Sequence, residues 1–324
     1  MNLLEIKNLS VEFPISDTTT FKAVDNLTIT LNQGETLGIV GESGSGKSMA
    51  MLALMGLVPW PGKIKADKLS FNGKNLFSLS TTERRKILGK DIAMIFQEPT
   101  SSLNPCFTTG FQIMETLAIH EGGSKRLLRK RAIELLDQVG ISDPKSRLDS
   151  FPHQLSGGMN QRIMIAMAIA CNPRLLIADE PTTALDVTIQ AQILDLLRVL
   201  RKERNMGLIL ITHDMGVVAE MSEKVMVMYA GQQMEMQDSN KIFFRPHHPY
   251  TAALLNALPE RSIEGEKLPT IPGVVPGVYD RPSGCLFHPR CQYAQIRCQQ
   301  EIPLIEGITN TQYRCHFPLN EPLK

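Results

Sequence analysis

The sequence lacks the features that mark several large classes of protein. It has no excess of charge of either sign, because 34 Lys and Arg residues face 33 Asp and Glu residues, for a formal net charge of +1. Nucleic-acid-binding proteins usually carry a basic surplus, so we expect no nucleic-acid partner. Residues 1–10 lack a basic segment followed by a long apolar one, and we therefore expect no signal peptide.

Long hydrophobic runs are also missing. The longest, at 51–60 and 163–171, are about half the length of the roughly 20-residue stretch that a bilayer-spanning helix needs. We therefore expect the chain to reach a membrane only through a partner. Hydrophobic residues still make up 43% of the 324 residues, which is enough to bury a sizeable core.

The apolar segments that are present alternate with helical patterns, which is typical of an α/β domain with parallel strands at its centre. The first 30 residues instead alternate apolar and polar side chains, which predicts an antiparallel sheet. From about residue 258 prolines, glycines and cysteines accumulate and helical periodicity is lost. We predict two domains, 1–258 and 259–324, with a mostly helical region at about 98–170 inside the first. Buried strands are expected at 36–40, 92–96, 175–178 and 208–211, and a helix at 47–57.

A glycine-rich turn lies between the first of these strands and the helix. Its sequence, Gly-Glu-Ser-Gly-Ser-Gly-Lys-Ser, has the glycines, lysine and serine of a P-loop at the required spacing. Glycines let successive backbone N–H groups point at phosphate oxygens, and the helix N-terminus adds a favourable dipole. We expect Lys47 to reach the β- and γ-phosphates of ATP and Ser48 to bind Mg²⁺. The residues expected to bind ATP are Gly41, Ser43, Gly44, Ser45, Gly46, Lys47 and Ser48.

Polar side chains follow the other predicted strands, at the ends where parallel α/β sheets bind ligands. The strand at 175–178 leads into Asp179, expected to hold Mg²⁺, and Glu180, expected to orient and deprotonate the attacking water. His213 is expected to contact the γ-phosphate, and Gln97 to contact Mg²⁺ and water. Each of these residues is common at a strand end, so their predicted roles depend on the P-loop that precedes them.

A second glycine corner, Leu-Ser-Gly-Gly-Met-Asn-Gln at 155–161, starts a predicted helix. With it, the order of motifs resembles that of the nucleotide-binding domains of ABC transporters, although their usual signature places glutamine directly after the glycines. Segments 96–105, 248–250 and 284–291 further resemble the bacterial dipeptide, oligopeptide and nickel importer ATPases, above all the dipeptide-permease branch. The motifs that carry the resemblance are the P-loop, Gln97, residues 155–161, Asp179-Glu180, Ala184-Leu185-Asp186 and His213.

This resemblance implies a P-loop NTPase with a RecA-like core, an N-terminal antiparallel β subdomain, a helical subdomain and a small Cys-rich C-terminal extension. It implies an ABC-type ATPase that powers the import of di- or oligopeptides. Its partners would be a second, related ATPase, two transmembrane permease subunits and an extracytoplasmic binding protein, at the cytoplasmic face of the bacterial inner membrane. The residues implied to act on ATP bound by the partner ATPase are Ser156, Gly157, Gly158 and Gln161, with Asp186 at the seam.

Several alternatives stay open at this point. Relatives that import nickel or antimicrobial peptides share these motifs. The motifs do not distinguish the imported substrate, because substrate choice lies in other subunits. ABC ATPases that act in DNA repair or on ribosomes usually show tandem cassettes, coiled-coil insertions or a basic surface, and this sequence shows none of these. The resemblance also implies an aromatic side chain that stacks on adenine, for which Phe13 and Phe21 are both candidates.

Four of the six cysteines gather in the last 40 residues. Without a secretion signal, clustered cysteines favour metal over disulfides. Their spacing matches neither the short ferredoxin run nor a zinc ribbon, and buried free thiols are the alternative. Some relatives with a similar tail carry a [4Fe–4S] cluster, whereas His288 and His316 keep a mixed zinc site possible. The expected cluster ligands are Cys285, Cys291, Cys298 and Cys315.

Overall fold

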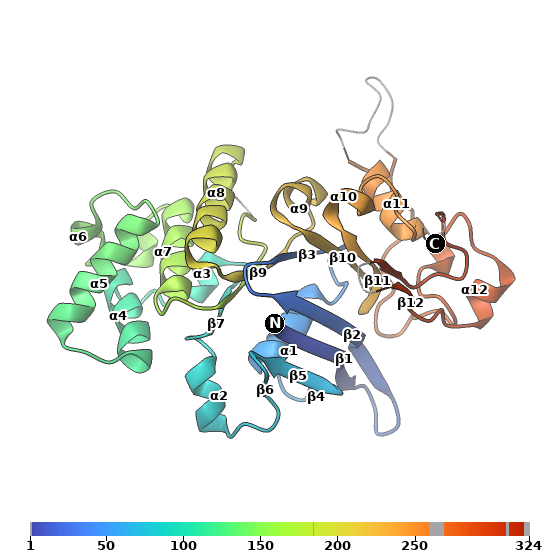
Figure 1. The fold of residues 1–324 in the computed structure, drawn as a ribbon, viewed down its shortest axis with the longest axis horizontal. Coiled ribbons are helices and arrows are strands. Elements are labelled where there is room, and N and C mark those ends of the chain that lie inside the picture. Colours follow the sequence, from blue (N-terminus) through green and yellow to red (C-terminus); the bar gives the residue numbers. More distant parts are fainter. Residues whose placement is uncertain (1, 184, 259–268, 309–310, 321–324) are drawn as a thin grey trace. The chain divides into compact units, whose positions relative to one another are not determined.

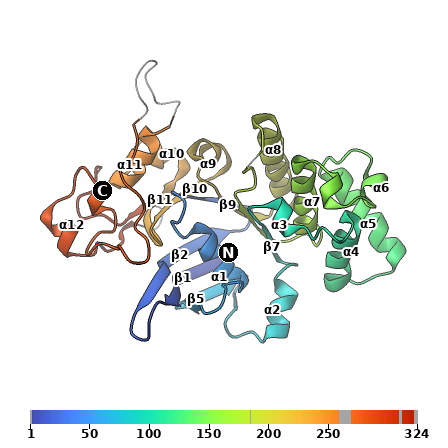
Figure 2. The ribbon, with the colours of Figure 1, turned by 180° about the vertical axis from the view of Figure 1, so that it is seen from behind.

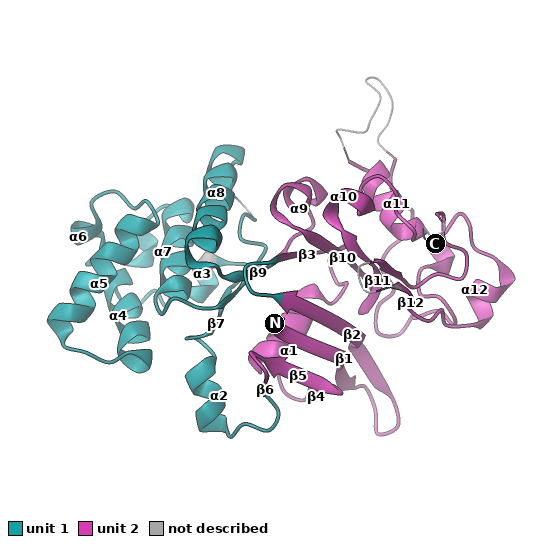
Figure 3. Cartoon of the chain, in the orientation of Figure 1, with its two compact units in different colours: residues 1, 32–35, 75–209 teal, residues 2–31, 36–74, 210–324 magenta. Residues whose placement is uncertain are grey.

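The computed structural model describes residues 2–183, 185–258, 269–308 and 311–320 (Figure 1). The chain divides into two compact units (Figure 3). Unit 1 contains 32–35 and the described part of 75–209, and unit 2 contains 2–31, 36–74 and the described part of 210–324. Two of the sequence-based predictions, the domain boundary near 260 and the role of Ala184, fall outside the described residues.

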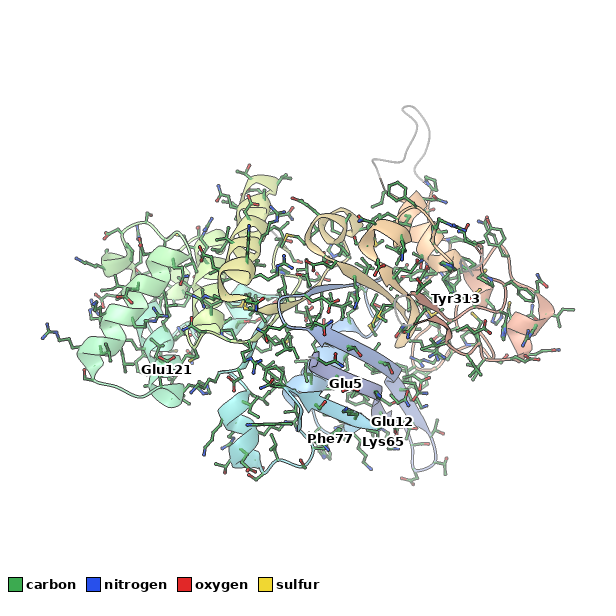
Figure 4. All side chains as sticks on the ribbon, viewed as in Figure 1. Glu5, Glu12, Lys65, Phe77, Glu121 and Tyr313 are labelled. Carbon is green, nitrogen blue, oxygen red and sulfur yellow. The ribbon has the colours of Figure 1, made fainter. Side chains whose placement is uncertain are left out.

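Unit 2 begins with the antiparallel sheet that the alternating N-terminal pattern predicts. Its strands run in the order β2-β1-β5-β6, and β4 also pairs with β1. The buried side chains of β1 face a core, whereas the opposite face carries charged pairs such as Glu12 and Lys65, whose side chains lie 2.7 Å apart (Figure 4). The strands are β1 (Asn2–Pro14), β2 (Thr20–Asn32), β4 (Lys63–Lys65), β5 (Lys68–Phe71) and β6 (Lys74–Asn75).

A mixed sheet forms the rest of unit 2, in the order β12-β13-β11-β10-β3. Strands β3 (Thr36–Val40) and β10 (Lys224–Tyr229) are parallel, and the neighbours after β10 are antiparallel. The turn between β10 and β11 has positive φ at Ala230 and Gly231. The other strands are β11 (Gln232–Asp238), β12 (Glu306–Ile308) and β13 (Thr311–Tyr313), and the helices are α1 (Lys47–Met55), α9 (Met215–Met221), α10 (Ser239–Ile242), α11 (Pro249–Asn256), η3 (His288–Arg290) and α12 (Ile296–Gln300).

Unit 1 combines parallel strands with a group of helices. Strand β7 (Ile92–Ile95) pairs in parallel with β8 (Leu175–Asp179), and both strands are fully buried. The boundary between the units falls inside β9 (Gly207–Ile211). The helices of unit 1 are α2 (Thr81–Ile87), α3 (Pro99–Ser102), α4 (Thr109–His120), α5 (Lys125–Gln138), α6 (Pro144–Arg147), η1 (Pro152–Gln154), α7 (Gly157–Ile169) and α8 (Val187–Arg204).

Helices α4, α5 and α7 of unit 1 pack on one another, as both views show (Figures 1 and 2). Five of the seven residues at 125–131, in the first half of helix α5, are Lys or Arg and give the helix a polar face. Its buried residues, Ala132, Leu135 and Leu136, instead follow helical spacing toward its C-terminal half. The basic segment is therefore the solvated face of a helix.

Two surface properties of the described residues bear on function. No helix in the described ranges combines enough length with enough apolar character to cross a bilayer. Trp60, the chain's only tryptophan, lies in unit 2 after α1 ends at Met55, and its side chain is 93% exposed.

Candidate functional site

The P-loop of unit 2 joins the end of β3 to the start of α1, as predicted. Gly41 has φ 149°, and a Cβ there would collide with the carbonyl oxygen of Met228. Gly46 has φ 94°, and a Cβ there would come within 2.5 Å of the carbonyl oxygen of Ala23. These glycines are therefore required by close backbone approaches as well as by φ.

The side chain of Lys47 lies against this loop. Its ammonium group donates to the carbonyl oxygens of Gly41 at 2.7 Å and Glu42 at 3.1 Å, and to the hydroxyl of Ser45 at 3.4 Å. Helix α1 starts after Gly46 without any side-chain cap, which leaves its N-terminal dipole directed at the loop. A glycine-lined loop, a lysine and an uncapped helix start together form a phosphate-binding arrangement.

His213 also belongs to unit 2. Its neighbour Thr212 donates its backbone N–H to the carbonyl oxygen of Ile39 in β3, so the end of β9 lies beside the strand that leads into the P-loop. The His213 side chain is exposed, and Asp214 caps α9 by accepting from Gly216 and Val217. His213 is thus brought to the P-loop edge of the sheet, as the sequence predicts.

The predicted Mg²⁺ and water-activating residues of unit 1 come together at the ends of β7 and β8. Ile95 pairs with Ala178, so the residues that follow both strands leave the same edge of the sheet. The amide of Gln97 donates to Oε2 of Glu180 at 3.1 Å. Asp179, the last residue of β8, is buried, with 4% of its surface exposed.

Glu180 is held in an uncommon backbone conformation. Its φ of 45° lies in the left-handed region, where a residue with a Cβ is strained. The hydroxyl of Thr183 donates to Oε2 of Glu180 at 2.8 Å, and the backbone N–H of Thr183 donates to the Glu180 carbonyl at 3.2 Å. Thr183 has no signal in the sequence, because a threonine three residues after a carboxylate forms no distinctive pattern. This loop fixes the orientation of one carboxylate.

The signature segment of unit 1 starts helix α7. Ser156 is the N-cap and accepts from the backbone N–H of Met159 at 3.3 Å. A Cβ at Gly157 would have no neighbour within 4 Å, so this corner is open on that side. The amide of Gln161, which is buried, donates to the carbonyl oxygen of Pro181 at 2.6 Å.

Asp186 has a local structural role that the sequence analysis did not predict. Its carboxylate accepts the backbone N–H of Ile189 at 3.0 Å and so caps the 18-residue helix α8. Of the adenine-stacking candidates, Phe21 has the guanidinium of Arg281 above its ring, 4.6 Å from the ring centre. Phe13 lies against Gly62, where a Cβ would contact its ring at 2.7 Å.

The four C-terminal cysteines line a single small cavity of about 20 Å³, together with His288 and His316. Burial raises the pKa of Cys285 to about 11 and that of Cys315 to about 12. Within the described ranges, no three His, Cys, Asp or Glu side chains are grouped so that they could hold a metal ion. The predicted convergence of the cysteines is therefore present, but an ion site is not formed.

The histidines near this cavity are already engaged. Nδ1 of His288 lies 3.0 Å from the carbonyl oxygen of Cys285, and Nε2 of His316 lies 2.9 Å from that of Glu301. Nδ1 of His248 accepts the backbone N–H of Tyr250 at 3.0 Å and caps α11. Burial lowers the pKa of His248 to about 4, which keeps its ring neutral at physiological pH.

Comparison with protein families matches two models. The family described as ABC transporter matches residues 24–183, and the one described as oligopeptide/dipeptide transporter, C-terminal region, matches residues 234–298. The two matched ranges contain the P-loop, the signature and most of the C-terminal cysteines.

Individual relatives are similar over nearly the whole chain. The dipeptide transport ATP-binding protein DppD of Escherichia coli (strain K12) is 58% identical over 322 residues, which cover 99% of this chain and 98% of that protein. The oligopeptide transport ATP-binding protein OppD of Haemophilus influenzae is 50% identical over 297 residues, which cover 92% and 91%.

A solved structure of an ABC ATPase superposes on the chain. The ATP-binding cassette MJ0796, in a dimeric post-hydrolysis state bound to ADP and phosphate, superposes with a TM-score of 0.64 at 28% identity, over 73% of this chain and 98% of that one. The expected P-loop NTPase fold with an antiparallel β subdomain is thereby confirmed. The chain belongs to the family of ATP-binding subunits of ABC transporters that import peptides.

Proposed function

We propose that this chain binds and hydrolyses ATP to drive the import of di- or oligopeptides through a membrane permease. The observation that carries the proposal is the restraint of Glu180, whose strained backbone and two side-chain donors, Gln97 and Thr183, aim one carboxylate at the end of β8. Phosphoryl transfer needs little covalent chemistry from the protein, so a positioned carboxylate beside a buried aspartate accounts for much of what the reaction requires.

The remaining roles follow from where each unit places its residues. In unit 2, residues 41–48 hold the triphosphate, with Lys47 neutralising phosphate charge and His213 contacting the γ-phosphate. In unit 1, Glu180 orients and deprotonates the attacking water. Mg²⁺, when bound, would supply charge neutralisation at the phosphates, and Ser48, Gln97 and Asp179 would hold it.

The signature corner acts on ATP held by a second, related ATPase. The Ser156 hydroxyl caps α7 as an acceptor and keeps its own proton to donate to a phosphate, and the open side of Gly157 leaves room for that phosphate to approach. Gln161 stabilises the corner, and Asp186 links the two nucleotide sites. We further propose the domain limits 1–258 and 259–324, with a helical subdomain at about 98–170.

The other components of the proposed transporter are two permease subunits and an extracytoplasmic peptide-binding protein. The chain then works as a peripheral subunit at the cytoplasmic face of the bacterial inner membrane. The 58% identity to a dipeptide transport protein over nearly the full length supports a peptide over nickel as the imported substrate.

A [4Fe–4S] cluster in the C-terminal extension is a separate proposal. A zinc ion needs donors within about 2.0–2.3 Å of one centre, and no three described donors are grouped for an ion. An iron–sulfur cluster instead takes four cysteine thiolates, and the side chains that line the cavity fit that donor chemistry. Iron and sulfide analysis after anaerobic purification, with Cys291→Ser as the comparison, tests it. A colourless, iron-free wild-type protein would contradict it.

The ATPase proposal is tested with two variants. Glu180→Gln keeps the shape of the side chain but removes its basic carboxylate, so ATP should bind normally while turnover is lost. Lys47→Ala should lose nucleotide affinity. The assignment of the base is wrong if Glu180→Gln hydrolyses ATP at the wild-type rate.

A further inference from the structure

The second residue of the P-loop is held by an arginine that is 248 positions away in the chain. The guanidinium of Arg290 forms a two-pronged ion pair with the carboxylate of Glu42, with Nη1–Oε2 at 2.8 Å and Nη2–Oε1 at 2.9 Å. The Arg290 side chain is 6% exposed and that of Glu42 is 30% exposed. Paired hydrogen bonds of this kind fix orientation as well as distance.

The backbone of Glu42 is held from the same region. Its N–H donates to the hydroxyl of Tyr250 at 3.0 Å. Tyr250 is fully buried, and its ring packs against those of Tyr229 at 4.8 Å and Phe287 at 5.2 Å between centroids. The backbone and the side chain of one P-loop residue are therefore each fixed by a buried or nearly buried side chain from beyond residue 234, all within unit 2.

Arg290 is itself firmly placed. Its Nε donates to the carbonyl oxygen of Pro272 at 2.7 Å, and Nη1 donates to the hydroxyl of Tyr229 at 3.3 Å. It ends the short helix η3, which lies between Cys285 and Cys291, and both of these line the cysteine cavity. The turn that presents Arg290 to the P-loop therefore lies beside that cavity.

We propose that Arg290 and Tyr250 are positioning residues through which the C-terminal region sets the affinity of the P-loop for ATP. The inference rests on the proposed nucleotide-binding role of residues 41–48 and goes beyond it. Arg290 neutralises a carboxylate that would otherwise stand, unpaired, in a loop that binds a highly negative triphosphate. Tyr250 fixes the backbone of that loop so that its N–H groups keep their directions.

The test measures the dissociation constant of a fluorescent ATP analogue for the full-length protein. Arg290→Gln should weaken binding about tenfold, because it leaves the Glu42 carboxylate unpaired. Tyr250→Phe should weaken it about threefold, since only one hydrogen bond is lost. Arg297→Gln is the matched control, because Arg297 forms an exposed pair with Glu301 in the same extension and should leave affinity unchanged.

The double variant separates a specific pairing from general damage. Glu42→Gln removes the carboxylate that Arg290 serves, so Arg290→Gln with Glu42→Gln should bind ATP as Glu42→Gln alone does. Circular dichroism confirms folding. If Arg290→Gln does not fold, Arg290→Lys replaces it, since it keeps the charge without the two-pronged geometry, and about a threefold loss is expected.

The outcomes distinguish this inference from the function on which it rests. If the wild-type protein and Lys47→Ala bind the analogue equally weakly, the nucleotide role of the P-loop fails. If the wild type binds and Lys47→Ala does not, the inference is overturned by an Arg290→Gln affinity within twofold of wild type. It is equally overturned if the losses in the double variant multiply.

Discussion

The side-chain amide of Gln161 donates a hydrogen bond to the carbonyl oxygen of Pro181 and so ties the signature helix to the loop that follows Glu180. Both residues are buried and both belong to unit 1. The signature segment therefore has a partner within its own chain, in addition to the proposed contact with ATP on a second subunit.

We expect Gln161→Leu to lower both stability and turnover. The change leaves the Pro181 carbonyl buried without its donor, which costs about 1–3 kcal/mol of unfolding free energy. It also frees the loop that carries Glu180, so kcat should fall. Urea unfolding followed by circular dichroism and steady-state ATPase assays check this, with the exposed Gln300→Leu on α12 as control. Equal behaviour of the two variants would rule out the link.

Thr183→Val should slow hydrolysis without weakening ATP binding. The valine has nearly the same shape but removes the 2.8 Å hydrogen bond to the Glu180 carboxylate. We expect kcat to fall about tenfold, the effect of about 1.4 kcal/mol of transition-state stabilisation, while KM stays constant. Thr188→Val, at an exposed position of α8, is the control. A raised KM with unchanged kcat would show that Thr183 acts on nucleotide binding instead.

Two P-loop glycines should differ in their tolerance of alanine. Both Gly44 and Gly46 have positive φ, so either substitution costs about 1–2 kcal/mol of backbone strain. At Gly46 the new Cβ would also lie 2.5 Å from the carbonyl oxygen of Ala23, whereas at Gly44 nothing lies within 4 Å. Gly46→Ala should therefore unfold at a clearly lower urea concentration than Gly44→Ala. Identical midpoints would mean that the loop can move aside.

Acid should lower the folding stability of the protein partly by protonating Glu235. This fully buried carboxylate accepts the backbone N–H groups of His247 at 2.7 Å and His248 at 2.9 Å. Burial alone would raise the pKa of Glu235, but hydrogen bonds from His247, Thr251 and the two backbone groups outweigh it and hold that pKa below its ordinary value of 4.5. The stabilisation is therefore present above pH 4.5 and is lost as the pH falls through the lowered pKa.

Glu235→Gln tests this directly. The new amide would set a donor against the backbone donors, so the variant should be less stable than wild type at pH 7 by about 1–3 kcal/mol. The difference should shrink below pH 4.5 in urea unfolding. Glu301→Gln, at an exposed pair, serves as control. A difference that stays constant from pH 7 to pH 3 would contradict the lowered pKa.

The sequence predicts those parts of the fold whose physics is local. Strand β3 is a short apolar run bounded by turn residues, and its limits at 36–40 are observed as predicted. Helix α1 starts at Lys47 as predicted but ends at Met55, because Gly56 adopts the left-handed conformation that closes a helix. The residues that follow β7 and β8 are likewise brought together, because parallel strands share an edge.

The parts of the fold that the sequence does not predict depend on contacts between residues far apart in the chain. Strand β11 reads Gln-Gln-Met-Glu-Met-Gln-Asp, a polar composition that gives no signal of a buried strand, yet all but its last residue are buried. The backbone N–H groups of residues 247 and 248 donate to the Glu235 carboxylate, and β13 pairs with the edge of β11. Burial of this polar strand is therefore favourable only after the chain has folded back. The pairing of Glu42 with Arg290 likewise has no local signal.

Because Trp60 is exposed, its fluorescence can report on changes at the surface around it. Since the indole is the only one in the chain and is already in water, unfolding should change its emission little. A subunit that covers this corner would instead exclude solvent from it and move the emission to shorter wavelengths. Fluorescence of the unlabelled chain can thus register assembly of the transporter while remaining nearly silent to denaturation.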